Sequence, residues 1–463
     1  MATRSWQTTD PSIRTMRDMT GGDLGSECPS ERLAVRVAQV VAAAAVSAMT
    51  VMVTVVSSVA SLTRRAQAAT AADAGPPSGL WDATVVANDV TVPFRFELVF
   101  PDKSRRQGDR NQVEGAFFNG DLRVRSTGGQ HDGSELTLQF DHYASQLRAR
   151  WDRGALIGTY GRNGQPPYPF RATPHLASAS PGSQGPPPSI AGQWEIAVNS
   201  PKGESAWRFF VRQSGAEVSA SILRVDGDTG TLSGSFQGDR FVLSHFSGAR
   251  PMLLEVSLLP SGALRLVQNG KTTYTAVKSS EARARNLPEP ADPSRWTSVK
   301  DPTEPFRFSG VDLDGKAVNQ ADPRFKGHVL LVNIMGSWCP NCHDEAPFLE
   351  ALYRTYRGRG LRVVSISFED AEQLANPTRL RAFIRAYGID YPVLLGGEPG
   401  EIGAKLPQAS NLDTWPATFF VGKDGRVRGT HAGFAGKATG AAHEALEAEI
   451  RATVERLLAE RAS

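Results

Sequence analysis

An apolar segment that leads directly into a cysteine pair and then into a helical pattern constrains the fold most. The segment "HVLLVNIM", residues 328–335, is mostly apolar, as in a strand that is buried on both faces of a sheet. Cys339 and Cys342 follow it, and helical periodicity continues to about Tyr356. Strands and helices alternate from about residue 303, so the sequence predicts an α/β domain over residues 303–463.

The preceding sequence has a different pattern. "FRFELVF" at residues 94–100 and "ELTLQF" at residues 135–140 alternate apolar and polar positions, as half-buried strands do. We predict two β-rich units, residues 80–175 and 191–279, each a small sandwich or barrel. Polar, proline-containing segments, residues 176–190 and 280–302, are predicted to be linkers.

The two β-rich units resemble each other in sequence. "GLWDATVV" around Trp81 returns as "GQWEIAV" around Trp194, and "GAL" at residues 154–156 returns at residues 262–264. The offset is about 110 residues at both places, which predicts an internal duplication. The tryptophans, Trp207 included, could line a ligand pocket, but we favour packing in the core. The sequence does not indicate what these units do.

An uncharged run near the N-terminus indicates export. Residues 1–36 are a polar tail, and Val37–Thr63 contains no charged residue, so residues 37–68 are predicted to be a signal peptide or a transmembrane anchor. The sequence leaves these two alternatives open. Both place most of the chain outside the cytoplasmic membrane and leave Cys28 cytoplasmic or removed. The net charge of +3, without a dense Lys/Arg stripe, excludes a nucleic-acid-binding protein.

The cysteine pair has the spacing of a redox centre. Pro340 suits the first position of a helix, so Cys339 would stand at the helix N-terminus, where the dipole favours a thiolate. Cys342, one turn along, would be the more buried partner. A structural zinc site would need a second cysteine pair, so no metal is predicted, and a structural disulfide would close too small a loop to stabilise the fold much. The predicted cofactor is the redox-active Cys339–Cys342 disulfide alone.

These residues also carry a family resemblance. "VLLVNIMGSWCPNCHDEAPFLEALY" together with "NLDTWPATFFVGKDGRV", about 80 residues later, resembles the TlpA-like thiol–disulfide oxidoreductases of the thioredoxin superfamily. The resemblance covers the C-terminal third of the chain. It implies a central sheet flanked by helices, with the cysteine pair opening the first long helix. It also implies a cis-proline loop at Trp415-Pro416 where a substrate segment docks.

Two polar residues near the cysteine pair are relevant to proton transfer at its thiols. Glu345 matches an acidic position of many TlpA-like proteins, and we predict that it manages the proton on Cys342; the alternative is a solvated acid on the helix surface. Asn333 stands where cytosolic thioredoxins carry a buried aspartate, and its amide cannot accept that proton.

Other neighbours form the environment of the pair. Trp338 shields the disulfide or packs in the core. Pro340-Asn341 replaces the Gly-Pro of cytosolic thioredoxins, which leaves the reduction potential open. His343 is either a cation that favours a thiolate or a surface histidine.

We therefore predict an exported or membrane-tethered thiol–disulfide reductase in which Cys339 attacks a client disulfide and Cys342 resolves the product. The resemblance implies a membrane thiol electron donor and disulfide-containing client proteins, with apocytochromes as candidates. Two alternatives are a β-rich envelope binding protein with an accessory redox domain and a thiol peroxidase. The peroxidase would need a Thr-x-x-Cys sequence, whereas Gly-Ser-Trp precedes Cys339.

Overall fold

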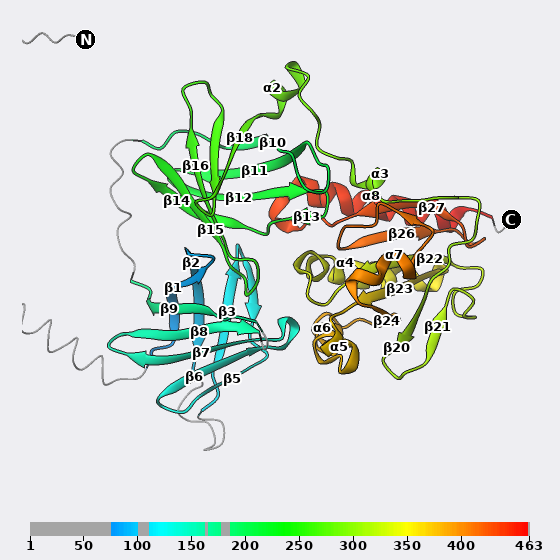
Figure 1. The fold of residues 1–463 in the computed structure, drawn as a ribbon, viewed down its shortest axis with the longest axis horizontal. Coiled ribbons are helices and arrows are strands. Elements are labelled where there is room, and N and C mark those ends of the chain that lie inside the picture. Colours follow the sequence, from blue (N-terminus) through cyan, green and yellow to red (C-terminus); the bar gives the residue numbers. More distant parts are fainter. Residues whose placement is uncertain (1–75, 101–110, 163–164, 177–185, 462–463) are drawn as a thin grey trace, which may run out of the picture. The chain divides into compact units, whose positions relative to one another are not determined.

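The computed structural model describes residues 76–100, 111–162, 165–176 and 186–461 (Figure 1). All of them belong to one structural unit, residues 71–463. The predicted tail, the apolar segment 37–68, Cys28 and most of the linker 176–190 lie outside the described residues. Among the helices described, none is both long and apolar enough to cross a membrane.

The first β-rich unit is a nine-stranded antiparallel sheet with the order β4-β3-β2-β1-β9-β8-β7-β6-β5. A bridge between Gln112 and Gln130 links the segment before β3 to β5, so the sheet curls toward a barrel. Its concave face buries Trp81, Phe96 and Phe117. The elements are β1 Gly79–Ala87, β2 Val90–Val99, β3 Glu114–Asn119, β4 Leu122–Arg125, β5 Gly128–His131, β6 Glu135–Phe140, the 3-10 helix η2 Asp141–Tyr143, β7 Ser145–Asp152, β8 Ala155–Arg162 and β9 Tyr168–Pro174.

The second β-rich unit is a closed barrel. Its strands follow the order β11-β10-β18-β17-β16-β15-β14-β12-β13, and the pairing of β11 with β12 closes a ring of eight. Trp194 and Phe209 are among the side chains that fill the interior. The strands are β10 Gly192–Ala197, β11 Ala206–Ser214, β12 Glu217–Arg224, β13 Gly227–Asp228, β14 Leu232–Gln237, β15 Arg240–His245, β16 Met252–Leu258, β17 Leu264–Gln268 and β18 Thr272–Lys278.

The two units share features that a duplication would produce. In each, the first strand pairs with the second and with the last. Trp81 lies opposite Phe96, and Trp194 lies opposite Phe209, so both tryptophans occupy the same register. Both are buried in their cores, as we favoured from the sequence. The common origin of the units stays a prediction.

The C-terminal domain has the predicted α/β architecture. Its sheet has the order β21-β20-β24-β23-β22-β26-β27, with β22, β23 and β24 parallel. The strands are β20 Ser309–Asp312, β21 Ala317–Asn319, β22 Val329–Met335, β23 Leu361–Phe368, β24 Val393–Gly397, β26 Ala417–Val421 and β27 Val427–Ala432; β19 Ser298–Val299 pairs separately with β25 Ala409–Ser410. The helices are α4 Pro340–Tyr356, η3 Arg357–Arg359, α5 Ala371–Ala375, α6 Thr378–Tyr387, η4 Pro399–Glu401, α7 Ile402–Lys405, η5 Lys437–Thr439 and α8 Ala441–Ala459.

The segment before this domain, predicted as a linker over residues 280–302, contains two short helices, α2 Ser279–Ala284 and α3 Pro293–Trp296. Asp292 caps α3 by accepting a hydrogen bond from the Ser294 N–H. The segment is thus partly ordered rather than extended throughout.

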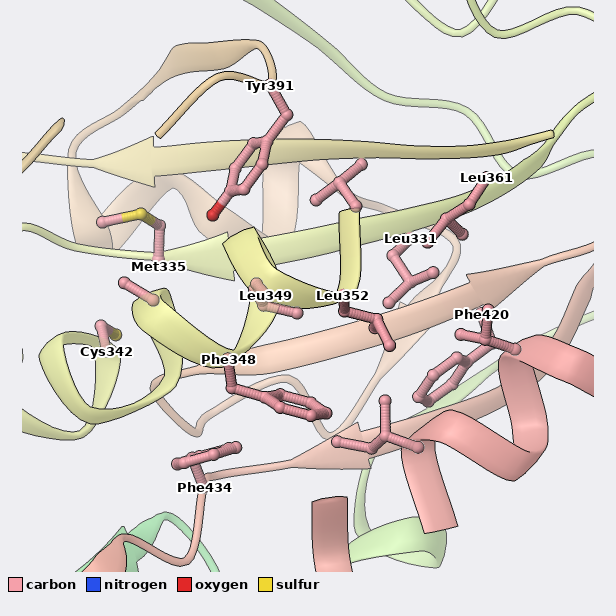
Figure 2. Packing of buried hydrophobic residues seen from close by; sticks show 14 of the residues in the cluster. Leu331, Met335, Cys342, Phe348, Leu349, Leu352, Leu361, Tyr391, Phe420 and Phe434 are labelled. Carbon is pink, nitrogen blue, oxygen red and sulfur yellow. The ribbon is translucent and has the colours of Figure 1, made fainter. Parts of the chain in front are cut away.

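Successive side chains of β22 point to opposite faces of the sheet, and each face contributes to a different hydrophobic core. Leu331 and Met335 pack with α4 and α8 on one face, while Leu330 and Val332 belong to the cluster on the other. Figure 2 shows the first cluster, in which Phe348 of α4 lies beside Phe434. One apolar face of the C-terminal helix α8 is buried here as well and comprises Leu446, Ile450, Val454 and Leu457. The sheet and α4 together fix the position of the cysteine pair.

Candidate redox site

The cysteine pair lies where β22 gives way to α4. Cys339 is the N-cap residue of α4 and Pro340 is its first helical residue, as predicted. The N–H groups of Cys342 and His343 both donate to the Cys339 carbonyl oxygen, at 3.1 and 3.2 Å. Both cysteines are free thiols and both are buried: Cys339 is 0% exposed and Cys342 is 2% exposed. The first cysteine therefore stands at the positive end of the helix dipole, but it is covered.

The loop that faces the pair contains the predicted cis-proline. The Trp415–Pro416 peptide bond is cis, and the Cys339 thiol donates to the Trp415 carbonyl oxygen at a Sγ–O distance of 3.4 Å. The Gly433 N–H donates to the Pro416 carbonyl oxygen at 2.7 Å. Residues 415, 416 and 433 thus form the surface beside Cys339.

A buried polar cluster lies beneath the first turns of α4. Asn333 on β22 lies opposite Ser365 on β23 and Thr418 on β26. Glu345 accepts hydrogen bonds from Asn333 Nδ2 at 2.7 Å and from Thr418 Oγ1 at 3.2 Å. The exposed fraction of Glu345 is 3%, so the alternative of a solvated surface acid is wrong.

Burial controls the acidity of this cluster. Desolvation raises the pKa of Glu345 to about 8, although the hydrogen bonds from Asn333 and Thr418 oppose the shift. Desolvation also raises the pKa of the Cys342 thiol, and the nearby Cys339 and Glu345 add to that shift. Glu345 is therefore mostly protonated at pH 7, and the ionised fraction that can accept a proton grows as the pH approaches 8.

A second buried network holds the segment just before the pair. Glu369 accepts from the Ser337 N–H at 2.8 Å and from Ser337 Oγ at 2.9 Å. Arg379 donates to Glu369 at 2.6 Å and to Ser337 Oγ at 2.8 Å. Because Glu369 and Arg379 are both almost fully buried, this ion pair fixes the backbone two residues before Cys339.

Trp338 lies beside the cis-proline loop. Its Nε1 donates to the Phe368 carbonyl oxygen at 2.9 Å, and its ring meets the Trp415 ring edge-on at a centroid distance of 5.4 Å. Both indoles are half-buried. Whether Trp338 shields the disulfide stays a prediction.

Both interpretations of His343, a cation beside the thiols and a surface histidine, are wrong, because the side chain is buried and neutral. Burial lowers its pKa to about 3. Its Nε2 lies 2.8 Å from the Ser337 carbonyl oxygen, which can only accept, so Nε2 carries the proton and Nδ1 accepts from the Tyr387 hydroxyl at 2.9 Å. Its ring also packs against Tyr143 of the first β-rich unit. The histidine therefore brings no positive charge to the cysteines.

Sequence reasoning missed several members of the site. Thr418 and Ser365 could have been found as polar residues in otherwise apolar strands, a pattern that marks a buried polar contact. Glu369 and Arg379 offered no comparable signal, because charged residues after a strand or on a helix are usually solvated. In the part of the chain that the structure describes, no three His, Cys, Asp or Glu side chains are grouped as a metal site.

A dithiol at a helix N-terminus, facing a cis-proline on a thioredoxin-like sheet, defines a redoxin-class domain. The sequence model of the Redoxin family matches residues 298–446. One solved structure, described as a putative thiol:disulfide interchange protein DsbE from Chlorobium tepidum, is 22% identical, with a TM-score of 0.27. That match covers 34% of this chain and 99% of that one.

Two curated relatives specify the family further. The thiol:disulfide interchange protein DsbE of Escherichia coli is 31% identical over 152 residues, which is 32% of this chain and 74% of that protein. The thiol-disulfide oxidoreductase ResA of Bacillus thuringiensis is 27% identical over 120 residues, 26% of this chain; the match spans 62% of the length of ResA. The chain belongs to this family of thiol–disulfide oxidoreductases through its C-terminal domain, which confirms the resemblance.

Proposed function

We propose that the protein is a thiol–disulfide oxidoreductase that reduces disulfides of client proteins through Cys339 and Cys342. The observation that carries the proposal is the placement of Cys339 at the N-terminus of α4, with its thiol on the Trp415 carbonyl beside cis-Pro416. Thiol–disulfide exchange needs a first cysteine that is favoured as a thiolate and a second within reach of the mixed disulfide.

The reaction conserves atoms and electrons in two steps. The Cys339 thiolate attacks one sulfur of the client disulfide, forms a mixed disulfide and expels the other client sulfur as a thiolate, which takes up a proton. The Cys342 thiolate then attacks Cys339 Sγ, closes the Cys339–Cys342 disulfide and releases the second client sulfur as a thiolate, which also takes up a proton. The client gains two electrons and two protons, and the protein loses the same number.

Glu345 would act in the second step. Cys342 must lose its proton to attack, and its raised pKa makes this loss unfavourable. Only the ionised form of Glu345 can accept that proton, and because the pKa of Glu345 is about 8, this form becomes abundant as the pH rises toward 8. We infer that Glu345 receives it inside the domain, where solvent is excluded.

The test is the redox equilibrium of the full chain against glutathione, read by thiol alkylation and mass spectrometry. We expect a reversible two-electron couple below about −200 mV, which would place the protein on the reducing side. Cys339→Ser should abolish the couple and the matched control Cys28→Ser should retain it. Glu345→Gln should slow the second step, while Glu449→Gln, which removes an exposed acid from α8, should not. Absence of a couple, or a metal held by both cysteines, would overturn the proposal.

We further propose that the protein works outside the cytoplasmic membrane, with a membrane thiol carrier as electron donor. The uncharged run of residues 37–63 supports export, and the donor follows from the family resemblance. Fractionation of cells that express the chain, with protease added to intact spheroplasts, tests the location. Protection of the redox domain from the protease would contradict it.

A further inference from the structure

A turn of the closed barrel lies against the redox helix. Val225 and Asp226 connect β12 to β13, which begins at Gly227; these three residues are called the β12–β13 turn here. Asn341, which stands between the two cysteines in sequence, donates from Nδ2 to the Asp226 carbonyl oxygen at 2.7 Å. A Cβ at Gly227 would lie 2.4 Å from Asn341 Nδ2 and 2.6 Å from the Phe434 carbonyl oxygen. Only glycine fits at position 227, because a side chain there would clash with Asn341 and with the backbone of Phe434.

The same turn contacts the surface beside the cis-proline. A Cβ at Gly433 would lie 2.4 Å from the Val225 carbonyl oxygen and 2.6 Å from the Gly227 nitrogen. Gly433 is the residue whose N–H donates to Pro416. The backbone of the turn thus lies on the surface where a client segment would approach Cys339.

Two polar contacts flank the turn. Lys202 Nζ donates to the Asp413 carbonyl oxygen at 2.9 Å, in the loop that leads to the cis-proline, and to Asp226 Oδ2 at 3.1 Å. Asp228 accepts from the Gly436 N–H on the other side. The barrel is therefore held to the redox domain on both sides of the turn.

Both cysteines are buried in this arrangement. A cavity of about 1700 Å³ opens beside α4, and Pro340 and Asn341 are among the described residues that line it, but neither cysteine is. Leu223 at the end of β12 packs against the core cluster that contains both cysteines. A client disulfide cannot reach the Cys339 sulfur while these contacts persist.

We propose that the β12–β13 turn is an internal occupant of the client-docking surface and must leave it before a client disulfide reaches Cys339. This inference rests on the proposed function for the meaning of the surface. The barrel then acts as a cover on the redox domain, which gives the second β-rich unit a regulatory task. Opening needs loss of the contacts described above, namely the hydrogen bonds, the close backbone approaches and the packing of Leu223, all of which lie around this one turn.

The experiment measures how fast iodoacetamide alkylates Cys339 in the reduced full chain, with the modified peptide quantified by mass spectrometry. Rates are compared on the alkaline plateau of each variant, which removes any change in thiol acidity. Gly227→Ala should push the turn away from Asn341, and Lys202→Ala should release the Asp413 loop. We expect each to raise the rate about fivefold, the factor that corresponds to one lost hydrogen bond of about 1 kcal/mol.

Matched controls distinguish displacement of the β12–β13 turn from a general loosening of the β-rich units. Gly262→Ala changes a positive-φ glycine of another barrel turn that has nothing within 4 Å. Lys271→Ala removes a lysine-to-carbonyl bond, to Asn88, that joins the two β-rich units and does not touch the redox domain. Both should alkylate at the wild-type rate. Equal alkylation rates in the wild type and all four variants, or equal increases in the controls and the test variants, would overturn the proposal that the turn covers Cys339.

The same samples equilibrated with glutathione test the proposed function separately. If no couple appears while Gly227→Ala still alkylates faster, the redox function fails and the cover stands. If the couple is present and the alkylation rates do not differ, the cover fails and the redox function stands.

Discussion

Replacing Glu345 by glutamine should change how the stability of the redox domain depends on pH. Glutamine has nearly the same shape as glutamic acid: its amide oxygen can accept from Asn333 Nδ2, and its amide nitrogen can donate to Thr418 Oγ1 once that hydroxyl rotates from donor to acceptor, so both partners of residue 345 are kept. Only the ability to ionise is lost. The variant therefore isolates the cost of a buried carboxylate.

The magnitude follows from the raised pKa. Glu345 titrates at about 8 in the folded domain, against an ordinary value of 4.5, a difference of about 3.5 units. At about 1.4 kcal/mol per unit this corresponds to about 5 kcal/mol. Between pH 4.5 and 8 the unfolded chain has lost this proton and the folded domain retains it, so the free energy of unfolding of the wild type falls as pH rises. Above pH 8 both states are ionised and the contribution is constant.

The assay uses Cys342 as a reporter of the redox domain alone, because it is buried in that domain's core. Reduced protein at graded guanidinium chloride concentrations receives a short pulse of thiol reagent, and the labelled fraction gives the free energy of unfolding from pH 5 to pH 9. Between pH 5 and pH 9, the stability of Glu345→Gln relative to the wild type should increase by about 4 kcal/mol, and the increase should level off near pH 8. A difference that stays flat over this range would refute the buried, neutral carboxyl. A difference that levels off near pH 5 would refute it equally.

Three further variants test other parts of the site. Asn333→Leu removes a donor to the Glu345 carboxylate, so the pKa of Glu345 should rise above its wild-type value in a ¹³C NMR titration; an unchanged value would exclude that hydrogen bond. Arg379→Met leaves Glu369 buried without its cation and should cost about 3–5 kcal/mol in the Cys342 labelling assay, and adding Glu369→Gln should restore part of the loss. If the double variant is no more stable than Arg379→Met, the ion pair does not explain the effect. His343→Gln should leave the pH profile of Cys339 alkylation between pH 5 and 8 unchanged, because His343 is neutral throughout that range; a shifted profile would restore a role for its charge.

The sequence by itself determined the local framework of the redox site. The apolar run before the pair, Pro340 after Cys339 and the helical period beyond them fix a strand, a helix start and the position of each thiol. The apolar face of the last helix and the two β-rich units were likewise readable from periodicity. Such features depend on residues that are close together along the chain, where backbone geometry and side-chain period leave few alternatives.

Tertiary structure alone decided the surroundings of the pair. Glu345 looked like a possible surface acid until the register of β22 with β26 placed Asn333 and Thr418 beneath it. His343 became neutral because Tyr387 and the first β-rich unit close around it. The barrel turn at Gly227 reaches Asn341 across more than a hundred residues of sequence. Burial and long-range register set these contacts, and both depend on how whole elements pack, which no local pattern of residues specifies.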